Sequence, residues 1–159
     1  MNAPVRIDPT AEGGACVPIS DLDAEGSVLH AAFHGINLAE LRKVLRAEMF
    51  FASAHQHIWE AVEHLGAQGR PADPVSVAGV MRERGTLAVS GGSHYLAETL
   101  ALCQPACARP ELHAMTVAEL WRRRTLARTM REVDIKLRHG ELDHRQAREA
   151  LRAHFAAVK

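Results

Sequence analysis

Imidazole and thiol groups are the side chains of this sequence with the most direct chemistry, because both bind metal ions and both take part in proton or group transfer. The chain has ten His and three Cys. His55 and His57 lie two residues apart, so on a helix they would point in different directions. Cys103 and Cys107 flank a Gln-Pro pair that predicts a turn, and no His-Glu-x-x-His or Cys-x-x-Cys spacing occurs. We therefore predict no metal site, no cofactor, and cysteines that are free thiols.

Catalytic machinery is not predicted either. Ser, His and Asp residues are present, but no feature singles out a hydrolytic triad, whose members are dispersed along a chain. Nucleotide hydrolysis by a P-loop enzyme needs a Gly-x-x-x-x-Gly-Lys-Ser/Thr loop, whose amides and lysine neutralise the phosphate charge. The sequence contains no such loop. We therefore predict no catalytic residues and a protein that is not itself an enzyme.

Segment 121–131 carries side chains suited to binding a partner. Arg124, Arg128 and Arg131 are spaced by four and three residues, so on a helix they share one face that would grip phosphates or an acidic protein. The alternative is an ordinary solvated helix flank. Trp121 precedes them, and it would either pack the helix onto the rest of the fold or contribute to a binding patch. We predict Trp121, Arg124, Arg128 and Arg131 as partner-binding residues.

A narrow apolar stripe runs through the same segment. It consists of Leu126, Met130, Val133 and Leu137, at intervals of four, three and four residues. Such a stripe between charged neighbours is typical of a helix that packs against another helix. We predict that these four residues mediate self-association, as a homodimer or a higher homo-oligomer.

Helix start and end signals recur along the chain, and the helices that they predict would carry the residues described above. No segment alternates apolar and polar residues for long enough to predict a strand. Asp73 followed by Pro74 predicts a helix start, because Asp accepts hydrogen bonds from the first turn and Pro fits its first position. Gly85 predicts the end of that helix. Further caps are predicted at Ser20, Asn37, Ser53 and Ser90. The expected fold class is all-α, with about five short helices before residue 102.

Beyond Pro110 the pattern is helical to His139 without another Pro or a Gly, a length of roughly 45 Å at about 1.5 Å per residue. Gly140 would end this helix and Asp143 would cap another, which gives a helical hairpin. The composition of the first residues is typical of a disordered arm. The predicted organisation is an arm over 1–19, a helical head over 20–108, and a hairpin with a C-terminal helix over 109–159.

Length, composition and charge limit the size of the core, the kinds of partner and the location that the chain can have. With 159 residues and 47% hydrophobic content, the chain is long enough for one core. Nineteen basic and nineteen acidic side chains give a formal charge of zero, so direct nucleic-acid binding is predicted to be weak or absent. No secretory or membrane-spanning segment is recognised, and three Cys form no evident disulfide framework. A cytoplasmic protein without membrane contact is expected.

Three motifs of the central region follow in an order that resembles the N-terminal domain of the DnaB-type replicative helicase family. They are Gly69-Arg70-Pro71-Ala72-Asp73, Gly85-Thr86-Leu87 and Gly91-Gly92-Ser93-His94-Tyr95-Leu96. Around them, Asp23 to Leu29 resembles the family's opening helix, and Met49-Phe50-Phe51 with His55 and Ile58 resembles its Asp-Phe-Tyr and His-x-x-Ile segments. Pro105 to Ala108 is similar to its Pro-Ser-Ala-Ala turn. The resemblance covers about residues 21 to 139, and the sequence departs from the family pattern at Gly26, Arg109 and His113.

The resemblance implies a helical head with a hairpin through which neighbouring subunits pair. It implies as partners the C-terminal domain of primase, a helicase loader or a replicative helicase. The predicted function is thus a non-catalytic interaction module of DNA replication that self-associates and docks such a protein. Two alternatives stay open: a small helical DNA-binding regulator, or the N-terminal fragment of an ATP-dependent replicative helicase. A purely structural homo-oligomer is a further possibility, because an apolar stripe specifies association rather than biology.

Overall fold

A computed structural model describes residues 19–101 and 109–157, and within these ranges the regular elements are helices. The head contains α1 (Leu22–Phe33), α2 (Leu38–Val44), α3 (Ser53–Ala67), α4 (Pro74–Glu83) and α5 (Gly92–Ala101). Two short 3-10 helices, η1 (Ala47–Met49) and η2 (Ala88–Ser90), lie between them. The long α6 (Pro110–Arg138) and α7 (His144–Ala157) follow. The all-α prediction and the five short helices are confirmed. Residues 1–18 of the predicted arm and the turn at residues 105–108 lie outside the described residues, as do all three cysteines.

Helix α1 is the centre of the head. Its residues Ala24 to Phe33 are all buried, because the helix contacts α2, α3, α5 and α6. A helix surrounded in this way is expected to be apolar on every side. Trp59 of α3 is fully buried beside it, and its indole Nε1 donates to Glu63 Oε1 at 3.1 Å, so the ring enters the core without an unpaired donor.

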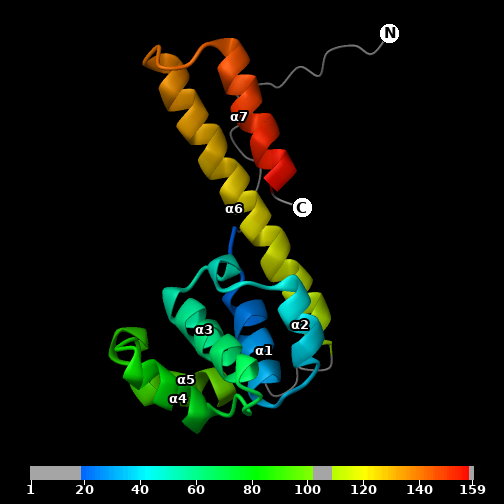
Figure 1. Ribbon diagram of the computed structural model, residues 1–159, viewed down its shortest axis with the longest axis vertical. Coiled ribbons are helices and arrows are strands. Elements are labelled where there is room, and N and C mark those ends of the chain that lie inside the picture. Colours follow the sequence, from blue (N-terminus) through cyan, green and yellow to red (C-terminus); the bar gives the residue numbers. More distant parts are fainter. Residues whose placement is uncertain (1–18, 102–108, 158–159) are drawn as a thin grey trace, which may run out of the picture.

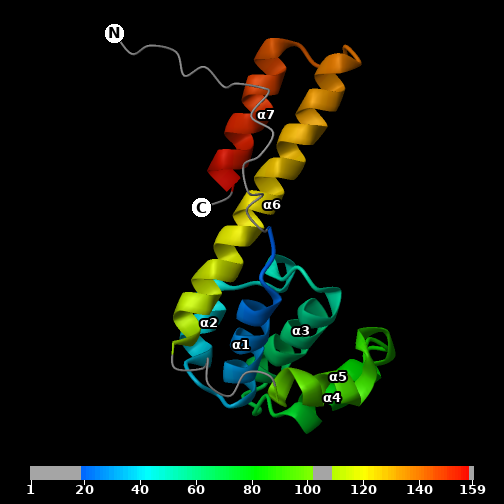
Figure 2. The same cartoon turned by 180° about the vertical axis from the view of Figure 1, so that it is seen from behind.

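Helix α6 belongs to both parts of the molecule. Its N-terminal half packs on α1 and α2, while its C-terminal half rises away from the head with α7 antiparallel beside it (Figures 1 and 2). The division at residue 109 stays a prediction, and α6 joins the head to the hairpin without a linker. Gly140, with φ +71°, ends the turn after α6, and Asp143 Oδ1 accepts from the amides of Arg145 and Gln146 at 2.8 Å.

The predicted helix starts agree with the structure better than the predicted capping hydrogen bonds do. Asp73 caps α4 as predicted, accepting from the amides of Val75 and Ser76 at 3.0 and 3.1 Å. The pKa of Asp73 is lowered from its ordinary value, mainly by the hydrogen bond from the Ser76 hydroxyl. In contrast, Asp21 rather than Ser20 caps α1, and neither the N-cap Asn37 of α2 nor the N-cap Ala52 of α3 makes a side-chain capping bond. Asn37 thus occupies the predicted N-cap position without the capping bond, Asp21 replaces Ser20 as the cap of α1, and Ser53 is the first residue of α3 rather than its cap. The cap predicted at Ser90 stays a prediction, and its hydroxyl lies 2.9 Å from His57 Nδ1.

Candidate interaction surfaces

Three side chains from separate motifs meet in a buried hydrogen-bonded chain. His55 Nδ1 lies 2.7 Å from Glu25 Oε2, and the hydroxyl of Tyr95 lies 2.9 Å from His55 Nε2. Glu25 and His55 are 1% and 4% exposed. A carboxylate only accepts hydrogen bonds, so His55 Nδ1–H donates to Glu25, and the ring's other nitrogen, Nε2, shares a hydrogen bond with the Tyr95 hydroxyl. Burial, together with the charges of Glu25 and Glu98, raises the pKa of Tyr95, which keeps this hydroxyl protonated.

Glu25 also holds the backbone at the start of α3. Its carboxylate accepts from the amides of Phe51 and Ala52, at 2.5 and 3.3 Å, just before the helix begins. A carboxylate at a helix N-terminus is favoured by the free amides and by the helix dipole. The network therefore ties α1, α3 and α5 together, and we interpret these three motif residues as structural rather than catalytic.

Arg124, predicted to bind a partner, is engaged inside the chain. Its two Nη atoms donate to the backbone oxygens of Ile19 and Met49 at 2.7 and 2.6 Å, and the guanidinium carbon lies 5.5 Å from the centre of the Phe51 ring. Burial lowers the pKa of Arg124 from its ordinary value, although the charge of Glu25 opposes this. The ordinary pKa of Arg is so high that the side chain stays charged. Arg124 thus fastens α6 to the head.

The other predicted partner-binding residues differ in exposure. Trp121 is half-buried at the point where α6 leaves the head, whereas Arg128 and Arg131 are exposed. Neither Arg128 nor Arg131 forms an ion pair with another described residue. Their role as partner-binding residues stays a prediction.

The predicted self-association stripe is divided between two environments. Val133 is only 7% exposed and Leu126 is half-buried, while Met130 and Leu137 are 55% and 40% exposed. Helix α7 packs on this part of α6, where the Thr129 hydroxyl lies 3.1 Å from His154 Nδ1. The stripe therefore faces a helix of the same chain at Val133, and Met130 and Leu137 are left for any contact with another chain.

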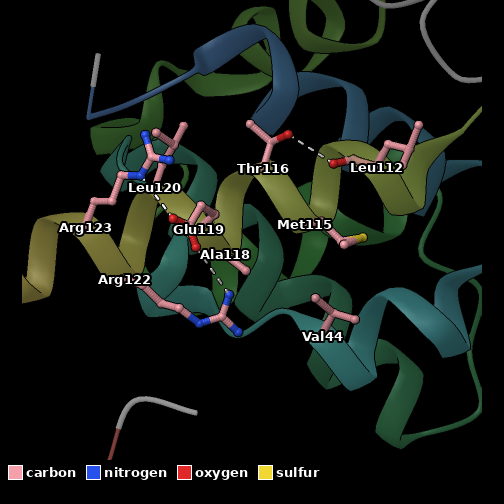
Figure 3. A pocket seen from close by; sticks show the side chains of 9 residues that line it. All are labelled: Val44, Leu112, Met115, Thr116, Ala118, Glu119, Leu120, Arg122 and Arg123. Carbon is pink, nitrogen blue, oxygen red and sulfur yellow. Dashed lines mark hydrogen bonds and ion pairs between the residues drawn. The ribbon is translucent and has the colours of Figure 1, made fainter. Parts of the chain in front are cut away.

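A groove on the outer side of α6 was not predicted. It has a volume of about 660 Å³ and lies between α6 and the end of α2, with Val44, Leu112 and Met115 among its lining residues (Figure 3). These three side chains are 41%, 53% and 61% exposed. Glu119 occupies one end, paired with Arg123 at 3.0 Å and Arg122 at 4.0 Å. Leu112 and Met115 are three residues apart, which is a weak helical signal, but their proximity to Val44 depends on tertiary packing.

The described part of the chain contains neither a cluster of metal-binding side chains nor a helix that could span a membrane. There, no group of three or more His, Cys, Asp or Glu side chains is arranged to hold a metal ion. No helix in the described ranges combines the length and the apolar character needed to cross a membrane.

These features define a class of protein: a helical head that carries a projecting helical hairpin, with its exposed apolar and basic groups on helix surfaces. Residues 17–119 match the model of the DnaB-like helicase N terminal domain family. The chain therefore belongs to the DnaB-like helicase N-terminal domain family, as the motifs predicted.

Individual relatives support this assignment. The chain is 37% identical to the replicative DNA helicase DnaB of Mycobacterium leprae over 112 residues, which are 70% of this chain and 18% of that protein. It thus spans about a fifth of that relative. The crystal structure of the N-terminal domain of DnaB helicase from Mycobacterium tuberculosis matches with a TM-score of 0.79 and 30% identity, over 89% of this chain and 99% of that one. The fold also matches a DnaB-like replicative helicase studied for its interactions with primase, with a TM-score of 0.67 and 20% identity, over 87% of this chain and 32% of that one.

Proposed function

We propose that this chain is a non-catalytic interaction module of DNA replication, which self-associates through its hairpin and docks primase, a helicase loader or a replicative helicase in the cytoplasm. The family match supports the setting, and the similarity to a helicase studied for its interactions with primase supports the kind of partner. If the chain is part of a longer protein, that protein would be an ATP-dependent DNA helicase and this module its interaction domain.

The observation that carries the self-association proposal is the poor burial of the hairpin. Among the described residues of α7, Ala147 alone is buried, and Met130, Ile135 and Leu137 on α6 are large and apolar. Their exposed fractions lie between 40% and 55%. Burial of apolar surface is worth about 25 cal/mol per Å², so covering these groups with a second copy would stabilise an assembly.

The test is the molar mass of the intact chain by size-exclusion chromatography with light scattering. We expect the wild type to be a dimer or larger, and the double variant Met130→Glu, Leu137→Glu to be a folded monomer. Val133 is left unchanged, because a charge at this buried position would displace α7 within the chain. Val75→Glu, Val89→Glu is the matched control: both valines lie on the head and are 82% and 75% exposed. If the Met130→Glu, Leu137→Glu variant keeps the molar mass of the wild type, the hairpin is not the interface.

For the docking of a partner we propose the groove along α6. Its exposed Leu112, Met115 and Val44 suit the apolar face of a partner helix, which binds such grooves through residues at helical spacing. The test is binding of the C-terminal domain of primase from the same organism to the immobilised chain. Leu112→Glu, Met115→Glu should weaken binding at least tenfold, and Val75→Glu, Val89→Glu should not. Equal binding by both variants would exclude the groove.

A further inference from the structure

Charge is segregated along the molecule, although its total is zero. Residues 120–159 carry eleven Lys and Arg against five Asp and Glu, a net charge of +6, and residues 1–119 carry eight against fourteen, a net charge of −6. Nearly all of the positive segment lies in the hairpin, which projects from the head (Figures 1 and 2). The electrostatic field around the hairpin is therefore that of a positively charged element, although the net charge of the whole chain is zero.

Most arginines of this positive segment form no ion pair with an acidic side chain of the described residues. Arg123 and Arg138 pair with Glu119 and Asp134, each at 3.0 Å. Five others are exposed and form no ion pair with a described residue: Arg128, Arg131, Arg145, Arg148 and Arg152. Unpaired exposed guanidinium groups are available to an external anion, and their planar fork suits phosphate oxygens.

Three of the five lie on one face of α7 together with an aromatic ring. Arg145, Arg148 and Arg152 are spaced by three and four residues, and Phe155 follows three residues later. The ring of Phe155 is 62% exposed. Beside it, where α7 ends against α6, is a cavity of about 180 Å³ lined by Phe155, His154, Leu126, Arg122, Arg123 and Glu119. At about 30 Å³ for each water molecule, this equals roughly six waters, enough space for the ring of one base.

We propose that this face of α7 binds single-stranded nucleic acid, with the three arginines on successive phosphates and Phe155 stacking on a base at the cavity. Grooves for single strands combine basic side chains with exposed aromatic rings, because every base offers a flat face for stacking. Arginines repeated along one helix face, on a segment with a net charge of +6, match the repeating phosphates of a strand, and the exposed ring supplies the stacking surface. The proposal goes beyond the protein partners proposed above and does not depend on them.

The test is the fluorescence anisotropy of labelled single-stranded oligothymidylate and oligouridylate, titrated with the intact chain at several salt concentrations. For single strands, log K falls with log salt by about 0.7 for each phosphate contacted. Arg145→Ala, Arg148→Ala, Arg152→Ala should therefore flatten this slope by about two and abolish most of the binding. Phe155→Ala should weaken binding by about tenfold, the effect of losing one stacked base, with the slope unchanged.

The matched control is Arg70→Ala, Arg82→Ala, Arg84→Ala, which removes the same charge from exposed positions on the head. It should retain wild-type affinity for the oligonucleotide. Equal losses in both triple variants, or no binding of either oligonucleotide at low salt, would overturn the proposal. So would equally tight binding of duplex DNA, or equal competition by polyglutamate, since either would identify a general polyanion surface. Oligomer mass and primase binding measured on the α7 variant keep this result separate from the function proposed above.

Discussion

At the scale of single residues, the motifs that identify the family are explained by one buried network. Glu25, His55 and Tyr95 belong to three different helices, and each satisfies the polar group of the next. Within the described residues, no buried side-chain nitrogen or oxygen lacks a hydrogen-bond partner. A satisfied buried network orients the helices that share it, whereas a network with one member missing is destabilising.

Tyr95→Phe tests this interpretation. The variant keeps the ring but leaves the buried Nε2 of His55 without a partner, so we expect the free energy of unfolding to fall by about 1–2 kcal/mol. Urea unfolding followed by circular dichroism measures it. Ser93→Ala, at an exposed position on the same helix, should change stability by less than about 0.5 kcal/mol. A Tyr95→Phe variant as stable as the wild type would mean that the hydroxyl contributes nothing to the fold.

At the scale of elements, helix ends depend on backbone conformations that only some residues adopt. Gly91 has a φ of +87° between η2 and α5, and a Cβ there would lie 2.8 Å from Tyr95 Cβ. Gly79 is different: it lies within α4 at an ordinary helical φ, and a Cβ there would meet no atom within 4 Å. The same substitution should thus have opposite effects at the two positions.

Gly79→Ala is expected to stabilise the chain by about 0.5–1 kcal/mol, because Ala loses less backbone entropy in a helix. Gly91→Ala is expected to destabilise it by more than about 1 kcal/mol, since the left-handed conformation strains a residue with a Cβ and the new methyl contacts Tyr95. Thermal unfolding of both variants measures the pair. Two shifts of the same sign would contradict this account of the turn.

At the scale of the whole molecule, stability is unevenly distributed. Ten residues of α1 are buried, but α7 contributes only Ala147, and its main contact is the exposed half of α6. Elements with little apolar burial open at lower free energy than the core. The hairpin should therefore be the first part of the molecule to open when it is not covered by a partner.

Hydrogen exchange followed by mass spectrometry would measure this difference. In the monomeric Met130→Glu, Leu137→Glu variant, we expect amides of α7 to exchange on the order of a hundredfold faster than those of α1 and α3. In the associated wild type, α7 should gain protection while the core does not change. Uniform protection across α1, α3 and α7 in the monomer would show that the hairpin is stable by itself.

Local patterns in the sequence were sufficient to predict the helical class, the long helix from Pro110, the hairpin turn at Gly140 and the family. These depend on local signals, such as glycines at positive φ, Asp caps and a proline at the first helical position, and local signals act within a few residues. The order of the motifs carried the family resemblance for the same reason, because each motif is a capping or turn device with its own short-range cause.

The contacts of several individual side chains could not be predicted in this way, because they depend on the packing of distant segments. Arg124 and Val133 looked like surface residues in the pattern, yet Arg124 bonds to the backbone of Ile19 and Met49, and Val133 is buried under α7. Likewise the carboxylate that holds the backbone at the start of α3 comes from Glu25, 26 residues before Phe51. Helical periodicity gives the face on which a residue lies but not the element that covers that face, because the contacts that cover it join residues distant in sequence.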